Sequence, residues 1–565
     1  MTRIVSLLAL CGAALTACGA SSKDAAGVGG ATNGPNGVGT GGNPSISSVG
    51  GNASASGGGG NATGGNFSGG ASSGGALSGV AGLNTGGTAQ GGSAGSSTSG
   101  TGGASGGAAG ISATGGMPSG PPTGVNFTTH DVDVQGMGSV FNVADDYFND
   151  GFIPPTPVAN FGCQSQITVV QHDDGSLDVA WLDYTLGGGK PWALPTPGMI
   201  NITHIDAALT GATSEATGIQ SYKLLGFTED ASGAVYLAYN KDHALKTNAQ
   251  DDENNINGNE LHVVKLGQGG WDQLIFGDQD NNADATPGDP GGAASSVLSF
   301  DPTNNVLVLY LGHSMMWTPT RHQAGYLRLI NPESGAVLPP AGDDILHFGA
   351  GWWYSHNFNQ RLIIDGGNYY LLAHGDAFSR QLGFARWSLS GYTDHNDTDF
   401  NESYWAIAGN EGDNNTNAQT GQFARMADGR FVITHTTSEG RNARDVRVIT
   451  ASGTDGTADT AGAVWLTSNP ADTHATMPKV ELLGDQLLVT YALWPGSGHT
   501  LSWYAALLDS SLATVVAAKQ VPNVEFVDSA PLFRFKGGLN LGNVGWVSGN
   551  ATHTLTVGIA SPSYQ

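Results

Sequence analysis

The sequence predicts an all-β domain built from seven copies of one antiparallel strand unit. Three observations support this prediction. Short runs of β-branched and aromatic residues fill the chain from residue 166 to the C-terminus, and pairs of these runs are joined by Gly, Asp or Asn turns. The pairs recur about every sixty residues, as in repeat architectures. No stretch has the length and periodicity of an amphipathic helix, which argues against an α/β fold.

Each copy begins with two strands and a tight turn whose residues supply the positive φ that hairpins require. The seven predicted pairs are 166–171 with 177–182, 222–227 with 235–239, 297–300 with 307–311, 361–364 with 369–374, 423–426 with 431–435, 480–483 with 487–491, and 532–535 with 543–547. The turns contain Gly175, Gly233, Asn305, Gly366-Gly367, Gly429, Gly484 and Gly537-Gly538. Third strands follow at 261–266, 326–330, 383–387, 446–449, 503–508 and 554–559.

Seven copies of this length resemble the blades of a β-propeller. The last copy ends after its third strand, whereas residues 125–134 form a strand-like segment that belongs to no copy. We therefore expect residues 125–134 to complete the final blade, which would close the ring without an exposed strand edge. Six or eight blades, or a pair of β-sandwiches, are the alternatives.

One position of the second strand carries an aromatic or histidine side chain in most copies. Its residues are Trp181, Tyr239, Gly312, His374, His435, Tyr491 and Trp546. The two histidines could be metal ligands that face each other across a channel. The Trp and Tyr residues in the same register favour the other interpretation, in which the rings pack between neighbouring blades.

The N-terminus has the features of a secretory leader. Arg3 precedes an apolar run too short to span a bilayer, and the run ends in Leu15-Thr16-Ala17-Cys18. This tetrapeptide resembles the lipobox of bacterial lipoproteins. The resemblance implies that residues 1–17 are a signal peptide and that Cys18 is acylated. Gly19 follows in place of Asp, which by resemblance to the enterobacterial sorting rule favours anchoring in the outer over the inner membrane, facing either the periplasm or the cell surface.

Residues 18–123 are expected to form a disordered tether between the acylated Cys18 and a folded domain at 124–565. Most of this segment is Gly, Ser, Asn, Thr and Ala, and its charged residues are Lys23 and Asp24. Such a composition gives a flexible coil. Long tethers of this kind resemble those of myxobacterial surface lipoproteins.

Charge and cysteine content exclude several classes of function. The chain has 21 Lys+Arg against 47 Asp+Glu and a net charge of -26, which argues against a nucleic-acid partner. Membrane contact is expected only through the lipid anchor, and a monomer is expected. Of 3 cysteines, Cys163 alone remains in the folded domain, so an intramolecular disulfide and a Cys-rich zinc site are both excluded.

The familiar catalytic motifs are absent. Residues 312–316 resemble a nucleophile elbow, but Met316 replaces the required Gly. The chain has no His-Glu-x-x-His and no Walker loop. A sialidase-like Asp box is also missing, since residues 452–456 have its residue types without its spacing.

The fourth copy offers a candidate ligand site, because it concentrates rings and charges around its inner strands. The residues are Trp353, His356, Arg361, His374, Asp376 and Arg380. Together they could bind a carboxylate or a sugar ring through Arg contacts and aromatic stacking. The alternative is an internal Arg–Asp pair that stabilises the blade.

An acidic loop offers a candidate Ca²⁺ site. Oxygen side chains occupy alternate positions at Asp278, Asp280, Asn282 and Asp284. Ala283 stands where a calcium loop of the EF type needs Gly, so a solvated acidic loop is the favoured alternative. No other cofactor is indicated.

These features favour a surface-anchored lipoprotein that displays a binding module for a carbohydrate or protein ligand. An anchor, a spacer and a rigid multi-bladed face are suited to the display of a binding surface. The sequence contains no catalytic signature that would indicate an enzyme. A polysaccharide-active hydrolase or lyase on the same scaffold is the main alternative, and a structural component of the envelope is a third. The fold class does not decide among them.

Overall fold

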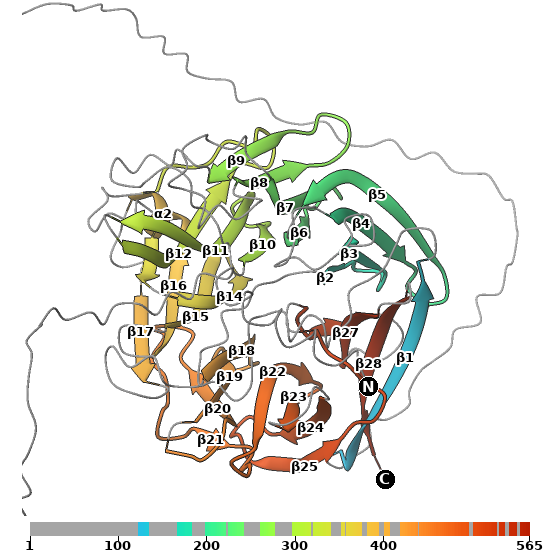
Figure 1. Cartoon of the computed structure of the whole chain (residues 1–565), viewed down its shortest axis with the longest axis vertical. Helices are drawn as coiled ribbons and strands as arrows, with labels where there is room; N and C mark the ends of the chain where they lie inside the picture. The colour runs from blue at the N-terminus through green and yellow to red at the C-terminus, as the bar shows by residue number, and fades with distance from the viewer. Residues whose placement is uncertain are drawn as a thin grey trace, which may run out of the picture. The chain divides into compact units, whose positions relative to one another are not determined.

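The chain forms a seven-bladed β-propeller. The computed structural model describes residues 122–134, 167–183, 198–221, 224–241, 260–276, 296–317, 320–340, 352–355, 357–375, 381–394, 401–406, 418–438, 440–495, 501–527, 530–536, 542–550 and 554–564. Seven antiparallel sheets of four strands each are arranged as a ring (Figure 1). The fold class predicted from the sequence is therefore confirmed.

The blades follow one another along the chain. The first has β2 (Ile167–Gln171), β3 (Leu177–Asp183), β4 (Gly198–Ile205) and β5 (Ala212–Ser221), and the second has β6 (Leu224–Glu229), β7 (Val235–Lys241), β8 (Glu260–Lys265) and β9 (Asp272–Phe276). The third has β10 (Ser296–Asp301), β11 (Val306–Trp317), β12 (Thr320–Ile330) and β13 (Trp352–Ser355). The fourth has β14 (Asn357–Asp365), β15 (Asn368–Gly375), β16 (Gln381–Ser388) and β17 (Asn401–Ala406).

The later blades repeat this order. The fifth has β18 (Ala418–Arg425), β19 (Phe431–Thr437), β20 (Asp445–Ala451) and β21 (Val464–Trp465), and the sixth has β22 (Thr473–Leu483), β23 (Gln486–Pro495), β24 (Ser502–Leu508) and β25 (Thr514–Gln520). The seventh has β26 (Phe533–Phe535), β27 (Asn543–Asn550), β28 (Thr554–Ser563) and β1 (Gly124–Asp133). The short helix α2 (Leu389–Asp394) follows β16. Within the described residues no helix is long and apolar enough to cross a membrane.

The ring is closed by its two ends. β1 pairs antiparallel with β28, from Gly124 opposite Ser563 to Asp133 opposite Thr554. This pairing makes β1 the outermost strand of the seventh blade, whose order is β1-β28-β27-β26. The expectation that residues 125–134 complete the last blade is confirmed.

The hydrophobic core lies between neighbouring blades. On β15, Leu371 packs with residues of the third blade such as Tyr310, while the next residue, Leu372, packs with residues of the fifth blade such as Phe431. Successive side chains of a strand point to opposite faces, so each inner strand contributes to two core layers. The fourth blade therefore packs against both of its neighbours in the ring.

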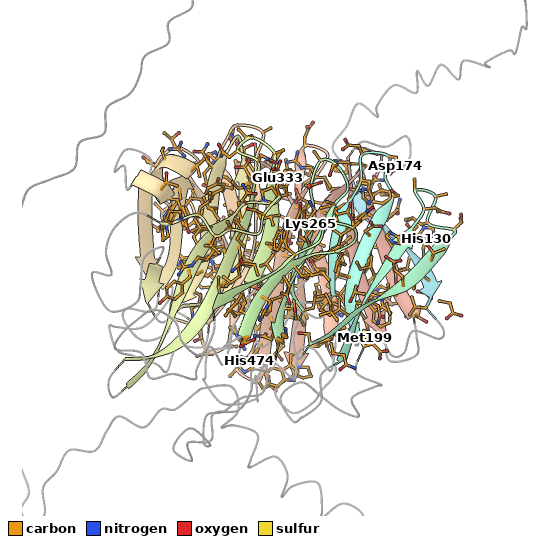
Figure 2. The ribbon with its side chains drawn as sticks, turned by 90° about the horizontal axis from the view of Figure 1, so that it is seen from above. His130, Asp174, Met199, Lys265, Glu333 and His474 are labelled. Atoms are coloured by element: carbon orange, nitrogen blue, oxygen red, sulfur yellow. The ribbon has the colours of Figure 1, made fainter. Side chains whose placement is uncertain are left out.

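The hairpin turns have the backbone conformation that the sequence predicts. Positive φ occurs at Gly175 (92°), Gly233 (79°), Asn305 (52°), Gly429 (87°) and Gly484 (62°). Gly366 and Gly367 also have positive φ. Gly537 and Gly538 lie outside the described residues. The β2–β3 turn, with Asp174, lies on one face of the ring, and Met199 and His474 lie on the opposite face (Figure 2).

The position of the second strand that carries Trp, Tyr or His in most copies is a packing position. Trp181, His374, His435 and Trp546 are almost fully buried, as are Tyr239 and Tyr491. Gly312 departs from the pattern because Gln360 from the next blade takes the space, and a Cβ on Gly312 would lie 2.7 Å from its Nε2 atom. The burial of all these rings supports the packing interpretation.

Candidate functional site

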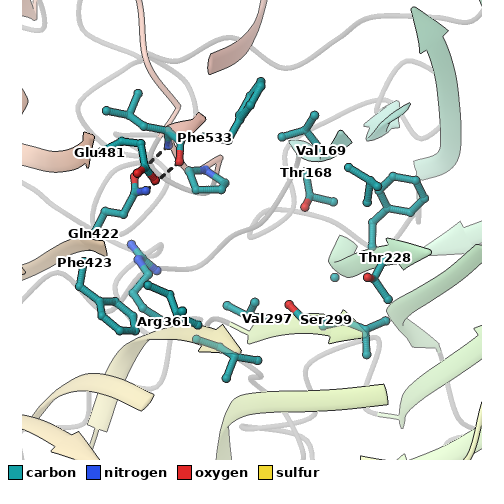
Figure 3. A pocket seen from close by; sticks show the side chains of 18 of the residues that line it. Thr168, Val169, Thr228, Val297, Ser299, Arg361, Gln422, Phe423, Glu481 and Phe533 are labelled. Carbon is teal, nitrogen blue, oxygen red and sulfur yellow. Dashed lines mark hydrogen bonds between the residues drawn. The ribbon is translucent and has the colours of Figure 1, made fainter. Parts of the chain in front are cut away.

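The inner strands of all seven blades surround a central cavity of about 370 Å³. Its walls come from β2, β6, β10, β14, β18 and β22, and from β26 with the residues just before it. Arg361 and Gln422 lie on one side of the hollow, opposite Thr168 and Thr228 (Figure 3). The volume is within the range of sites that bind small molecules or a sugar unit of a longer chain.

The cavity is positively charged, although the chain as a whole is strongly acidic. Among the described residues that line it, Arg361, Lys479 and Arg534 are cationic and Glu481 is the one acidic group. The whole chain has a net charge of -26. A walled hollow with an excess of one charge sign concentrates ligands of the opposite charge, so this cavity favours anions.

Glu481 and Arg534 form an ion pair at the cavity wall. Arg534 Nε donates to Glu481 Oε1 at 3.3 Å, and the Leu482 amide donates to the same oxygen at 2.8 Å. The Glu481 side chain is 14% exposed, and burial raises the pKa of its carboxyl group against the opposing effect of these donors. The Arg534 side chain is 59% exposed and therefore has room to turn toward a ligand.

Other cavity residues are fixed by backbone contacts. Lys479 Nζ donates to the Ala530 carbonyl at 2.8 Å, and Lys479 is almost fully buried. Gln422 Nε2 donates to the Leu532 carbonyl, and the Leu532 amide donates back to Gln422 Oε1, both at 2.8 Å. These bonds attach the segment before β26 to the fifth and sixth blades. The cavity wall is therefore organised before any ligand arrives.

The structure separates some of the site residues predicted from the sequence. Arg361 lines the cavity on β14, and its Nη1 donates to the Gln360 carbonyl at 3.2 Å. His374 is buried on the neighbouring strand β15. Trp353 lies on β13, the outermost strand of the third blade, and thus in a different sheet. Among the described members of that set, Arg361 is the residue that lies at the cavity.

Several predicted residues lie outside the described residues. They are His356, Asp376 and Arg380 of the ligand site, Asp278, Asp280, Asn282 and Asp284 of the acidic loop, and the lipidation residue Cys18.

Sequence reasoning missed Gln422, Lys479, Glu481 and Arg534. All lie within or beside strands that the repeat pattern predicts as the first of their copies. The charged side chains in these first strands could have indicated the cavity. First strands line the axis of a propeller, and a charged side chain there needs a polar hollow or a partner.

A second polar group lies where the first two blades adjoin. It contains His172, Asp178, His204 and Glu229. Burial raises the pKa of Glu229 to about 8, and the neighbouring Asp178 carboxyl group adds to this effect. None of the four residues lines the central cavity.

Comparison with known proteins gives similarity to solved structures alone. No family model and no curated protein sequence matches the chain. A point mutant of NanB sialidase from Streptococcus pneumoniae has 12% sequence identity and a TM-score of 0.36, over 76% of this chain and 70% of that one.

Two further solved structures are of other glycan-cleaving enzymes. A polysaccharide lyase of family PL25, an ulvan lyase bound to -[GlcA(1-4)Rha3S]-, has 10% identity and a TM-score of 0.39 over 76% of this chain and 95% of that one. An α-L-arabinanase from Penicillium chrysogenum has 9% identity and a TM-score of 0.33 over 60% and 92%.

Proposed function

We propose that the protein is a polysaccharide-active enzyme whose central cavity takes an anionic sugar unit. The observation that supports this most is the concentration of Arg361, Lys479 and Arg534 around one buried carboxyl group, Glu481, in an otherwise acidic chain. Carboxylate and sulfate groups on a glycan are the anions that such a cavity suits, because guanidinium groups bind them with two parallel hydrogen bonds.

Glu481 is the group that favours catalysis over binding alone. Binding an anion requires only the cations, whereas proton transfer requires an acid that is protonated near the working pH. Burial raises the pKa of Glu481 and so favours that protonated form. In this proposal Arg361 and Arg534 hold the anionic group of the substrate, and Glu481 donates a proton to the sugar oxygen that departs as the glycosidic C–O bond breaks. In hydrolysis a water adds to the sugar carbon and its proton restores Glu481. In a lyase reaction the C5 proton of the uronate restores Glu481, and the C5–H electrons form the C4=C5 double bond.

The second candidate is a binding module that holds the same glycan without cleaving it. Glycoside hydrolysis commonly uses two carboxyl groups about 5–10 Å apart. Among the described residues that line the cavity, Glu481 is the single carboxyl group. This observation favours binding over hydrolysis, although a lyase reaction does not require the second carboxyl group.

Cleavage assays on the purified full chain distinguish the two candidates. Polygalacturonate, alginate and chondroitin sulfate serve as anionic polysaccharides and dextran as the neutral control. New reducing ends report hydrolysis, and ultraviolet absorbance of unsaturated uronates reports a lyase. We expect cleavage of an anionic chain by the wild type and its loss in Glu481→Gln. Binding of an anionic chain without any cleavage would contradict the enzyme proposal and favour the binding module.

We also propose where this activity takes place. Acylation of Cys18 would anchor the chain in a bacterial outer membrane, and the Gly-rich segment after it would hold the propeller away from the lipid. A tether of about 100 residues has a root-mean-square reach of roughly 50–60 Å. That reach suits a substrate that is too large to be taken up intact, such as an extracellular polysaccharide.

A further inference from the structure

Four polar side chains come together at the junction of the first and second blades. His172 follows β2, Asp178 lies on β3, His204 lies on β4 and Glu229 ends β6. A metal-ligating atom from each of His172, Asp178 and Glu229 lies within 4.8 Å of the other two. The three residues come from two sheets, so ring assembly creates this arrangement.

The distances suit a small divalent ion. His172 Nε2 lies 3.2 Å from Asp178 Oδ2, and His172 Nδ1 lies 3.8 Å from Glu229 Oε2. Ligand atoms about 2.1 Å from a tetrahedral zinc ion are about 3.4 Å apart. The His172 side chain is 34% exposed, so its ring has room to bring one nitrogen into line with both carboxylates.

Glu229 gives independent support for a cation site. Its side chain is only 7% exposed, and its Oε1 atom is buried without a hydrogen-bond partner. Asp178, 10% exposed, is the neighbouring carboxyl group. In the described part of the chain, no Lys or Arg forms an ion pair with Asp178 or Glu229. Two buried carboxyl groups without a fixed positive charge are costly unless they share a proton or a cation joins them.

We propose that His172, Asp178 and Glu229 bind a zinc ion, with His204 as the residue that positions Asp178. His204 Nδ1 lies 2.6 Å from Asp178 Oδ1, the contact that commonly orients a ligating carboxylate. A hollow of about 810 Å³, lined in part by His172, Asp178 and His204, opens beside the group. Water from this hollow would fill the fourth position of the ion.

The ligand chemistry selects zinc over calcium. An imidazole with two carboxylates is a mixed nitrogen and oxygen set, which suits zinc. Calcium prefers six to eight oxygen ligands, and magnesium keeps most of its waters. Because Glu229 belongs to the second blade and the other ligands to the first, bound zinc would join the two blades and stabilise the folded chain.

The test is metal binding by the purified full chain, prepared without a polyhistidine tag and freed of metal by a chelator. Zinc, calcium and magnesium are titrated by calorimetry, and the melting temperature is measured with and without zinc. We expect one zinc ion per chain, no competition from calcium or magnesium, and a zinc-dependent rise in melting temperature. Glu229→Gln and His172→Ala should weaken zinc binding at least tenfold and remove that rise.

Glu215→Gln is the matched control. Glu215 Oε1 lies 3.8 Å from His204 Nε2, but its side chain is 68% exposed and it is not among the three ligands. This variant should bind zinc as the wild type does. Melting curves of the metal-free variants show whether each one is folded. Absence of zinc binding to the wild type, or equal binding by a folded Glu229→Gln variant, would overturn the proposal.

Discussion

Trp546 lies over Gly558, the residue directly opposite it in the β27–β28 ladder, and a Cβ atom at residue 558 would overlap the indole. The same indole contacts Phe127 of β1 edge-on, with ring centroids 5.8 Å apart, and Phe526 at 5.0 Å. Trp546 therefore joins the closing strand to the core between the sixth and seventh blades. The absence of a side chain at Gly558 makes this packing possible.

Gly558→Ala should destabilise the propeller although it adds a single methyl group. The methyl group and the Trp546 indole cannot share the space, and overpacking of a buried ring typically costs about 1–3 kcal/mol or more. Urea unfolding of the purified chain measures the loss. Gly233→Ala is a useful comparison, because a Cβ there meets no atom within 4 Å and the cost comes from its positive φ alone. Equal losses of stability in the two variants would show that the Trp546 indole shifts to accommodate the methyl group at little cost.

Deletion of residues 124–133 should destabilise the whole propeller in one cooperative step. The deletion exposes the edge of β28, which pairs with β1 along ten residues, and removes the Phe127 contact with Trp546. Differential scanning calorimetry should show a lower melting temperature and one transition. A deletion of equal length in the Gly-rich segment is the control, and an unchanged melting temperature in the first variant would contradict the closure by β1.

His435 should make the propeller sensitive to acid. Its ring is fully buried, and neither nitrogen has a hydrogen-bond partner among the described residues. Burial, helped by Arg447 on the neighbouring strand, lowers the pKa of His435 to about 3. The unfolded chain binds the proton near pH 6.5, so the stability that His435 contributes is complete above that pH and is lost as the pH falls toward 3.

His435→Met should reduce this loss. Between about pH 6.5 and 4.5 the titration of His435 accounts for about 2–3 kcal/mol of stability, at about 1.4 kcal/mol per pH unit. Urea unfolding at about pH 7 and 4.5 should therefore show a smaller decrease for His435→Met than for the wild type. His130→Gln on β1, where the ring is half-buried, should behave as the wild type. A decrease of the same size in both variants would exclude His435 as the source.

Cys18→Ser should release the protein from the membrane fraction. The proposed acyl chains require the thiol, so the variant should move to the aqueous phase in detergent phase separation. The propeller lies far along the chain from Cys18, and its melting temperature should be unchanged. Cys11→Ser, within the proposed leader, is the control and should still be anchored. Retention of Cys18→Ser in the detergent phase would remove the lipoprotein interpretation.

The inner part of each blade could be predicted from the sequence. All residues of β19 and most residues of β23 are buried, so their apolar runs stand out, and Gly or Asp turns mark their ends. Apart from β1, the outermost strands gave no such signal. β5 alternates exposed and half-buried residues, and its sequence of Ala, Thr, Ser, Glu and Gly resembles a loop. Hydrogen bonds to the neighbouring strand define such a strand in the structure, and the sequence alone does not reveal these bonds.

The candidate site could be predicted only in part. Arg361 was found because charges cluster around the fourth copy, but its cavity neighbours Lys479 and Glu481 come from the sixth blade. Residues that are distant in the sequence meet only after the ring closes. The group of His172, Asp178 and Glu229 was missed for the same reason, since Glu229 belongs to another blade.

The affinity of Arg361→Gln for an anionic oligosaccharide tests the central claim most directly. Fragments of polygalacturonate, alginate and chondroitin sulfate are titrated into the wild type by calorimetry, and the tightest ligand is then titrated into two variants. Arg361→Gln should bind about 10–100-fold more weakly, because a hydrogen bond to a charged group contributes about 1.5–3 kcal/mol. Arg430→Gln, which changes an exposed arginine paired with Asp428 outside the cavity, should bind as the wild type does. Equal affinity of the wild type and Arg361→Gln, or no preference for anionic fragments over dextran, would contradict the account.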